Sequence, residues 1–141
     1  MKIALLFLLL IPCLACGQNS KPESTFQKLK ARLIDFTPDK LCAQCGYSLA
    51  ASTFKFEVVE GSEEFQKGQN ILVTISCAGD NAFAYYKKTG NTLFEDRQDY
   101  LLLLYKPTAV PADIKQFQDL CSPYYEGENL PRLCSESLEK L

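Results

Sequence analysis

The sequence predicts an α+β fold, a small antiparallel β-barrel or curved sheet of four or five strands with an N-terminal helix and C-terminal helical segments. Three observations predict it. Apolar and polar residues alternate over residues 53–60 and 70–77, with the period of two that is typical of strands. Residues 99–106 are apolar on both faces, as a central strand is. Apolar residues recur at helical spacing near both ends of the domain.

The first predicted element of the domain is a helix over Ser20–Phe36. Ser20 and Glu23 have the spacing of a capping box. The apolar positions that follow lie at i, i+3, i+7 and i+10, as one face of a helix requires: Phe26, Leu29, Leu33 and Phe36. A short helical turn is expected over Asp39–Cys45, before the first strand.

The first two strands are expected to pair antiparallel. One face of each carries apolar side chains, which are Phe54, Phe56 and Val58 in the first strand and Ile71, Val73 and Ile75 in the second. A turn over residues 78–81 leads to a third predicted strand, Ala82–Lys88. Residues 92–94 form a candidate short strand. Asp99–Lys106 is predicted to be central, with a helix covering its second face.

The C-terminal third of the chain is expected to be mainly helical. One helix is predicted over Ala112–Cys121. A polar loop then carries Tyr124 and Tyr125. Leucines and a cysteine at helical spacing predict a closing helix over Leu130–Leu141.

The strand sequences resemble the netrin-like, TIMP-like version of the OB barrel. The likeness rests on F-x-F-E-V-V-E-G, then K-G-Q-N-I-L-V-T-I-S-C, and later D-Y-L-L-L-L-Y, and it covers about residues 42–141. In that family such a strand pair is followed by a Y-L-L strand and a cysteine-bearing C-terminal helix, so the resemblance implies an OB-like barrel. The family's mature chain starts with Cys-x-Cys, whereas the pair here, Cys42 and Cys45, lies well inside the chain. Protease inhibition is therefore not implied.

The N-terminal residues predict export. Lys2 is followed by twelve apolar or proline residues, Ile3–Leu14. A membrane-spanning helix needs about twenty residues, so this length fits the apolar region of a signal peptide instead.

The end of this segment, Leu14-Ala15-Cys16-Gly17, resembles the lipobox of bacterial lipoproteins. In that family the cysteine thiol takes a diacylglyceryl group and the peptide is cut just before it, which would make Cys16 the first mature residue. The sequence departs from the family at Cys13, where leucine is preferred. The alternative is ordinary cleavage after Gly17, which would release a soluble chain beginning at Gln18.

The lipobox divides the chain into a signal peptide over residues 1–15, a lipid-anchored tether over 16–25 and a single globular domain over 26–141. Without residues 1–15, the 141-residue chain keeps 126 residues, enough for one domain with a hydrophobic core. We expect an exported protein anchored to a membrane of the bacterial cell envelope, with a soluble secreted protein as the alternative.

Composition excludes several functions. Histidine is absent, which excludes Ser-His and Cys-His nucleophile pairs and the histidine-containing catalytic metal sites. Loss of Lys2 leaves 14 basic against 17 acidic side chains, a formal charge of −3, which argues against nucleic-acid binding. The sequence therefore predicts a non-enzymatic protein with no catalytic residue, metal or cofactor. Its expected partners are a membrane at Cys16 and a protein or glycan.

Seven cysteines are present, and Cys13 leaves with the signal peptide. If Cys16 is lipidated, the disulfide candidates are Cys42, Cys45, Cys77, Cys121 and Cys134. Five is odd, so two disulfides and one thiol are expected in an oxidising compartment. We predict that Cys121 pairs with Cys134, and that Cys77 pairs with Cys42 or Cys45.

Cys42-Ala-Gln-Cys45 also admits a thiol-redox reading, since a C-x-x-C at a helix start has a lowered thiol pKa. It equally resembles half of a zinc or rubredoxin knuckle, although no second C-x-x-C follows. The leading prediction is a lipid-anchored, non-enzymatic binding or structural module. The alternatives are a secreted redox or metal-binding protein that uses Cys42 and Cys45, and a soluble secreted netrin-like inhibitor.

Overall fold

The computed structural model of the chain describes residues 25–36, 45, 50–116, 118–119 and 122–141. The predicted signal peptide, nearly all of the predicted tether and, apart from Cys45, the predicted helical turn lie outside these residues. So do Cys16, Cys42 and Cys121. Within the described part, no helix is both long enough and apolar enough to cross a membrane.

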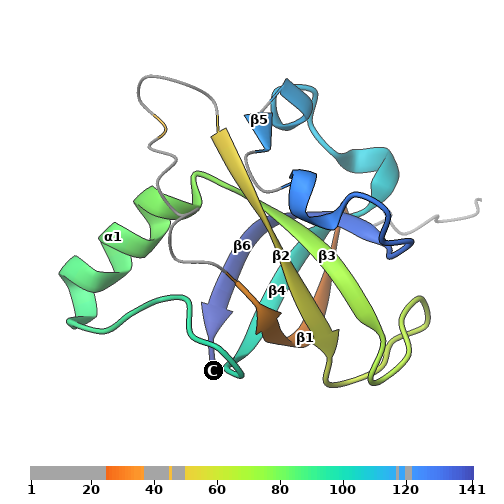
Figure 1. The fold of residues 1–141 in the computed structure, drawn as a ribbon, viewed down its shortest axis with the longest axis horizontal. Coiled ribbons are helices and arrows are strands. Elements are labelled where there is room, and N and C mark those ends of the chain that lie inside the picture. Colours follow the sequence, from red (N-terminus) through yellow and green to blue (C-terminus); the bar gives the residue numbers. More distant parts are fainter. Residues whose placement is uncertain (1–24, 37–44, 46–49, 117, 120–121) are drawn as a thin grey trace, which may run out of the picture.

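Five strands form a closed barrel of mixed strand direction (Figure 1). They are β1 (Phe26–Asp35), β2 (Ala50–Val58), β3 (Asn70–Ser76), β4 (Asp99–Tyr105) and β6 (Arg132–Lys140). Around the barrel the order is β1–β4–β6–β3–β2, and β2 closes the ring by pairing with β1. All of these pairings are antiparallel except the one between β3 and β6. The small α+β barrel expected from the sequence is thus confirmed, with mixed rather than purely antiparallel pairing.

Two connections carry the remaining elements. Helix α1 (Ala78–Thr89) lies between β3 and β4. The long connection from β4 to β6 holds three short 3₁₀ helices and a two-residue strand: η2 (Pro107–Ala109), η3 (Ile114–Gln116), β5 (Gln118–Asp119) and η4 (Ser122–Tyr125). Strand β5 pairs in parallel with the first residues of β2.

The predictions for β2, β3 and β4 are confirmed. Strands β2 and β3 pair antiparallel, and their predicted apolar faces lie in the core with exposures of at most 2%: Phe54, Phe56, Val58, Ile71, Val73 and Ile75. Strand β4 lies between β1 and β6, and its inward side chains are buried as well. Its outward Leu101 and Leu103 are only half-buried. A hollow lies beside these two leucines, and the described residues that line it all belong to β1, β4 and β6. No described helix therefore covers this face of β4, in contrast to the prediction.

The predicted N-terminal helix is wrong where the structure describes it, because this stretch is strand β1. Leu29, Ala31 and Leu33 point into the barrel and are at most 3% exposed, which is the alternation of a strand. A β-bulge after Leu33 then shifts the register, so Phe36 again packs against the core. Leu29 and Leu33 are four residues apart because they lie on one face of the strand, and the bulge places Phe36 three residues after Leu33. Together these spacings imitate one face of a helix.

The predicted C-terminal helix Leu130–Leu141 is wrong for the same reason, because this stretch contains strand β6. Leu133 and Ser135 are buried on the barrel side. A bulge then shifts the pairing with β4, and Leu138 packs against the core in turn. The cysteine-bearing C-terminal helix implied by the netrin-like resemblance is therefore replaced by a strand that carries Cys134. The predicted helix Ala112–Cys121 is also wrong where it is described, since η3 and β5 occupy that stretch.

The predicted strand Ala82–Lys88 belongs instead to helix α1. Ala78, Ala82 and Tyr85 contact the core at the i, i+4, i+7 spacing of one helical face. The alternation in the sequence placed Phe83 and Tyr85 on one side and Ala84 and Tyr86 on the other. It therefore did not separate apolar from polar positions, as the alternation of a half-buried strand does. Gly90 ends the helix in the left-handed conformation, with φ of 75°.

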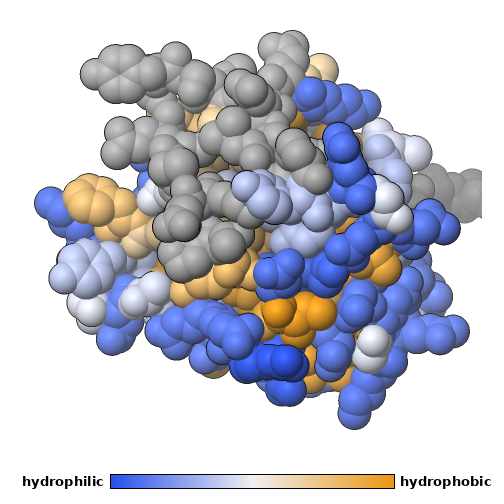
Figure 2. Space-filling model, viewed as in Figure 1, coloured by the Kyte–Doolittle hydropathy of each residue, from blue (hydrophilic) through white to orange (hydrophobic). Residues whose placement is uncertain are grey.

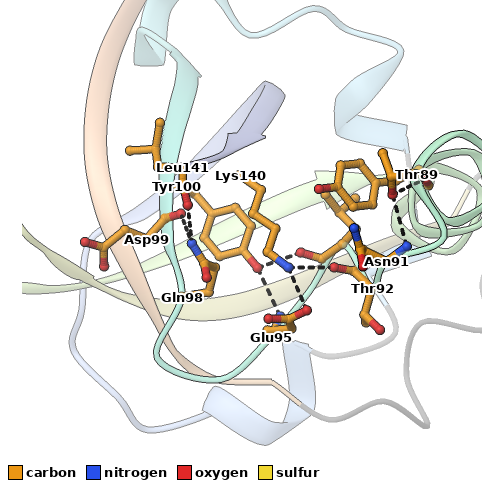
Figure 3. A network of polar contacts seen from close by, with 11 residues as sticks. Thr89, Asn91, Thr92, Glu95, Gln98, Asp99, Tyr100, Lys140 and Leu141 are labelled. Carbon is orange, nitrogen blue, oxygen red and sulfur yellow. Dashed lines mark hydrogen bonds and ion pairs between the residues drawn. The ribbon is translucent and has the colours of Figure 1, made fainter.

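The segment between α1 and β4 is a packed irregular stretch in place of the candidate strand over residues 92–94. Leu93 and Phe94 are buried in the core. The Tyr100 hydroxyl donates a hydrogen bond to the Leu93 carbonyl at 2.7 Å and accepts one from the Glu95 amide at 3.0 Å (Figure 3). Burial raises the pKa of Tyr100 to about 12. Tyr100 thereby holds this segment against the barrel.

Candidate functional site

A disulfide joins the connection before β2 to the start of α1. Cys45 is bonded to Cys77, with their Cα atoms 5.3 Å apart. This confirms one of the two partners predicted for Cys77. The Cys45 amide also donates a 2.7 Å hydrogen bond to Oδ2 of Asp80 in the first turn of α1.

The same three side chains bring two sulfurs and a carboxylate oxygen within 4.8 Å of one another. A metal would need thiolates as ligands, and here the two sulfurs are bonded to each other. The arrangement therefore acts as a cross-link in this form of the chain, and metal binding would first require its reduction.

The other predicted cysteine sites are only partly placed. Cys134 is half-buried on the outer face of β6, opposite Thr74 of β3. Its predicted partner Cys121, the lipidation candidate Cys16 and Cys42 lie outside the described residues, so the bond between Cys121 and Cys134 and the lipid at Cys16 stay predictions.

The outer face of β2 and β3 is covered by the chain itself. Thr53 and Leu72 point away from the core cluster, yet they are 1% and 0% exposed. The connection between β4 and β6 accounts for contacts on this side. Lys55 forms an ion pair with Glu128 at 2.6 Å, and the amide of Leu72 donates to the carbonyl of Pro131 at 2.9 Å. This face is therefore closed to a large ligand.

The two tyrosines predicted to lie in this polar loop, Tyr124 and Tyr125, differ in their exposure to solvent. Tyr125 is 4% exposed, and its hydroxyl donates to Oδ2 of Asp35 at 3.2 Å. The Lys55 ammonium lies 5.4 Å from the centre of its ring. Tyr124 is 63% exposed. Tyr125 is thus part of the cover over β2, whereas Tyr124 is largely exposed to solvent.

An open groove lies between α1 and the C-terminal half of β6. It arises because β3 pairs with β6 only as far as the Ile75–Ser135 pair, after which the chain turns at Cys77 into α1. Strand β6 continues to Lys140 with β4 on its other side. The groove has a volume of about 300 Å³. Its lining comes from both walls: Ile75, Asn81, Ala84, Tyr85, Lys88, Leu93, Glu136, Ser137 and Leu138.

One wall of the groove is an edge of β6 that pairs with no described strand on the groove side beyond Ser135. The amide of Leu141 donates to the carbonyl of Asp99 on β4 at 3.0 Å. Because successive residues of an antiparallel ladder point their backbone groups to opposite sides, those of Leu138 and Lys140 point away from β4. On that side, the described pairing of β6 with β3 has already ended at Ser135. Backbone donors and acceptors are therefore presented to the groove.

The groove has an apolar floor and charged rims. Ile75, Leu93 and Leu138 supply the apolar lining. Lys88 stands on the α1 rim and Glu136 on the β6 rim, and within the described residues neither forms an ion pair.

A charged contact lies at the end of β6, beyond the residues that line the groove. Lys140 donates to the Thr92 carbonyl at 2.8 Å and pairs with Glu95 at 2.6 Å (Figure 3). Its side chain is only 14% exposed. This contact ties the end of β6 to the segment that follows α1.

The solvent side of α1 is apolar in part. In the space-filling view, apolar surface stands out over α1 from polar surroundings (Figure 2). Phe83 and Tyr86 are 62% and 59% exposed, and the Lys87 ammonium lies 5.1 Å from the centre of the Phe83 ring. The two neighbouring tyrosines of α1 lie on different sides of the helix, since Tyr85 lines the groove and Tyr86 faces solvent.

Sequence reasoning missed the groove because it assigned both of its walls to the wrong secondary structure. A usable signal was present, since Gly90 followed by asparagine is a typical helix C-cap, and Lys87 and Lys88 suit a last helical turn. Comparison with known proteins adds no further guide: no family model, no curated protein and no solved structure matches the chain.

Proposed function

We propose that this chain is a non-enzymatic binding or structural module of the bacterial cell envelope, exported and held at a membrane by lipid on Cys16. One observation carries the proposal, the junction Leu14-Ala15-Cys16-Gly17 directly behind the apolar run Ile3–Leu14. Two or three acyl chains together give a stable anchor.

The position of β1 supports a tether between lipid and domain. Strand β1 begins at Phe26, so residues 17–25 would link the anchor to the barrel. At about 3.4 Å for each extended residue, this link reaches about 30 Å. The domain would thus stay near the membrane while still being able to turn its surfaces toward a partner.

We further propose that the barrel is OB-like, and that its ligand site is the groove between α1 and β6. Five strands around one core and an incomplete pairing between β3 and β6 support the first part. OB barrels commonly bind ligands on the face of strands 2 and 3. Here Glu128 and Pro131 of the long connection contact the equivalent face, which favours the groove as the binding surface.

Cys16→Ser tests the anchor. In the producing bacterium, the variant should lose radiolabelled or alkyne-labelled fatty acid and move from the membrane to the soluble fraction. Cys13→Leu is the matched control, because it removes a thiol from the same segment, supplies the leucine that the lipobox prefers and should leave Cys16 labelled. Unchanged membrane retention of Cys16→Ser would contradict the proposal.

The intact mass of the mature protein separates the alternatives. A mass beginning at Gln18 without acyl groups would favour the soluble secreted protein, including the netrin-like inhibitor. A thiol-redox or metal-binding protein based on Cys42 and Cys45 would require Cys45 to leave its bond with Cys77. Thiol counting and zinc analysis on the same sample test that requirement directly.

A further inference from the structure

We propose that the groove between α1 and β6 binds an extended peptide from another protein, which adds a strand to the stretch of β6 that no described strand pairs with on this side and directs a carboxylate to Lys88. The inference rests on the binding role proposed above and does not depend on the lipid anchor.

The backbone of β6 supplies the first part of the recognition. Beyond Ser135, the amide and carbonyl of Leu138, a residue of the groove lining, point away from β4 and toward the groove. An added strand can satisfy these groups with its own backbone, whatever its side chains are. Strand β3 occupies the same side of β6 as far as Ile75, so the peptide would continue the sheet where β3 leaves it.

The length of the groove sets the length of the peptide. From Glu136 to Leu138, the β6 residues that line the groove, the strand advances about 7 Å at 3.3 Å for each residue. From Asn81 to Lys88, α1 advances about 10 Å at 1.5 Å for each residue. The groove therefore fits about two or three extended residues, and its volume of about 300 Å³ is at the lower end of the range for ligand pockets.

The side chains of the groove select the peptide. A residue cross-strand from Leu138 would share its face and contact Ile75 and Leu93, so this position favours a β-branched or other apolar side chain. Lys88 is the cation in the groove lining and forms no ion pair among the described residues. It therefore complements a carboxylate, either of an acidic side chain or of a peptide C-terminus.

Selection from a displayed library of random hexapeptides against the purified full chain tests the proposal. Enriched peptides should combine β-branched residues with a carboxylate, and fluorescence anisotropy then gives their affinities. Lys88→Glu should weaken binding by about tenfold or more. Lys87→Glu is the matched control, since it makes the same charge change one residue away without lining the groove, and it should stay within about twofold.

A second variant blocks the groove without changing its charge. Ala84→Trp places an indole at the α1 wall and should abolish binding, whereas Ala112→Trp, at an exposed position outside the groove, should not. Circular dichroism checks that each variant is folded. Comparison of free and amidated C-termini tells which source supplies the carboxylate.

Two results would overturn the proposal. One is the absence of any enriched peptide, or equal affinity of the enriched peptides for wild type, Lys88→Glu and Ala84→Trp. The other is concentration-dependent self-association that Ala84→Trp abolishes, which would assign the groove to a second copy of this chain. Either result leaves the Cys16→Ser experiment unaffected, so a failure of the anchor and a failure of the groove can be told apart.

Discussion

Removal of the Tyr100 hydroxyl should lower the free energy of unfolding of the barrel by a large amount, although the substitution removes only one oxygen atom. In Tyr100→Phe the Leu93 carbonyl loses its donor at 2.7 Å and the Glu95 amide loses its acceptor at 3.0 Å. Two lost hydrogen bonds, one buried and one partly buried, cost about 2–4 kcal/mol in the free energy of unfolding. For a domain of this size, that lowers Tm by about 8–16 °C. Urea and thermal unfolding measure both quantities.

The pH dependence gives this prediction a second readout. Burial raises the pKa of Tyr100 from 10.0 to about 12 in the folded state, so the protonated hydroxyl stabilises the fold fully below about pH 10. This contribution is lost as the pH rises from 10 to 12, and about 1.4 kcal/mol should be gone at pH 11. Phenylalanine has no proton to lose. The stability difference between wild type and Tyr100→Phe should therefore narrow between pH 8 and pH 11.

Tyr86→Phe is the control for this experiment, because Tyr86 is 59% exposed on the solvent side of α1. It should change the free energy of unfolding by less than about 0.5 kcal/mol. A loss of stability in Tyr100→Phe no larger than that in Tyr86→Phe, or an equal loss at pH 8 and pH 11, would contradict this prediction.

Two further predictions concern the cross-link and the surface charge. Replacing both Cys45 and Cys77 by alanine should lower the free energy of unfolding by about 3–4 kcal/mol, because the bond closes a loop with a sequence separation of 32; equal urea midpoints with and without the bond would contradict this. Hydrogen bonds from Arg32 lower the pKa of Asp99 below 3.8. Asp99 therefore stabilises the fold above about pH 4, and its contribution is lost as the pH falls through the folded-state pKa. Asp99→Asn should lower Tm by about 2 °C at pH 7 and by less at pH 2.5, as measured by thermal unfolding.

The covered barrel face changes which surface a partner can use. Lys55, Tyr125 and Glu128 form a contiguous set of contacts between β2 and the long connection. A ligand at this face would have to displace an ion pair and a buried tyrosine. The groove and the exposed aromatic side chains of α1 require no such displacement, so they are the surfaces at which partners should first be sought.

Strands β2, β3 and β4 could be predicted because each runs through the core without interruption. In β2, Phe54, Phe56 and Val58 keep one parity along the whole element, and this is the pattern that a sequence displays directly. Strands β1 and β6 each contain a bulge. A bulge inserts one residue and reverses the parity, so inward residues fall three or four apart and resemble a helical face.

The disulfide, too, could be predicted only in part from the sequence. Sequence alone limited the partner of Cys77 to two candidates, Cys42 and Cys45, and could not choose between them. The position of Cys77 at the start of α1 brings it to Cys45, whose amide is also bound by Asp80. The choice therefore depends on where a helix begins, which the sequence had assigned to a turn and a strand.

Local patterns in the sequence were enough to predict the class of the fold, three of its strands, two possible partners for Cys77, and export with lipidation at Cys16. These predictions depend on short stretches, such as a period of two, an apolar run or a lipobox. The bulged strands, the parallel pairing of β3 with β6, the covered face and the groove became known only from the tertiary structure. Each of these depends on where one strand stops relative to its neighbour, and that relation arises between segments that are distant in the chain.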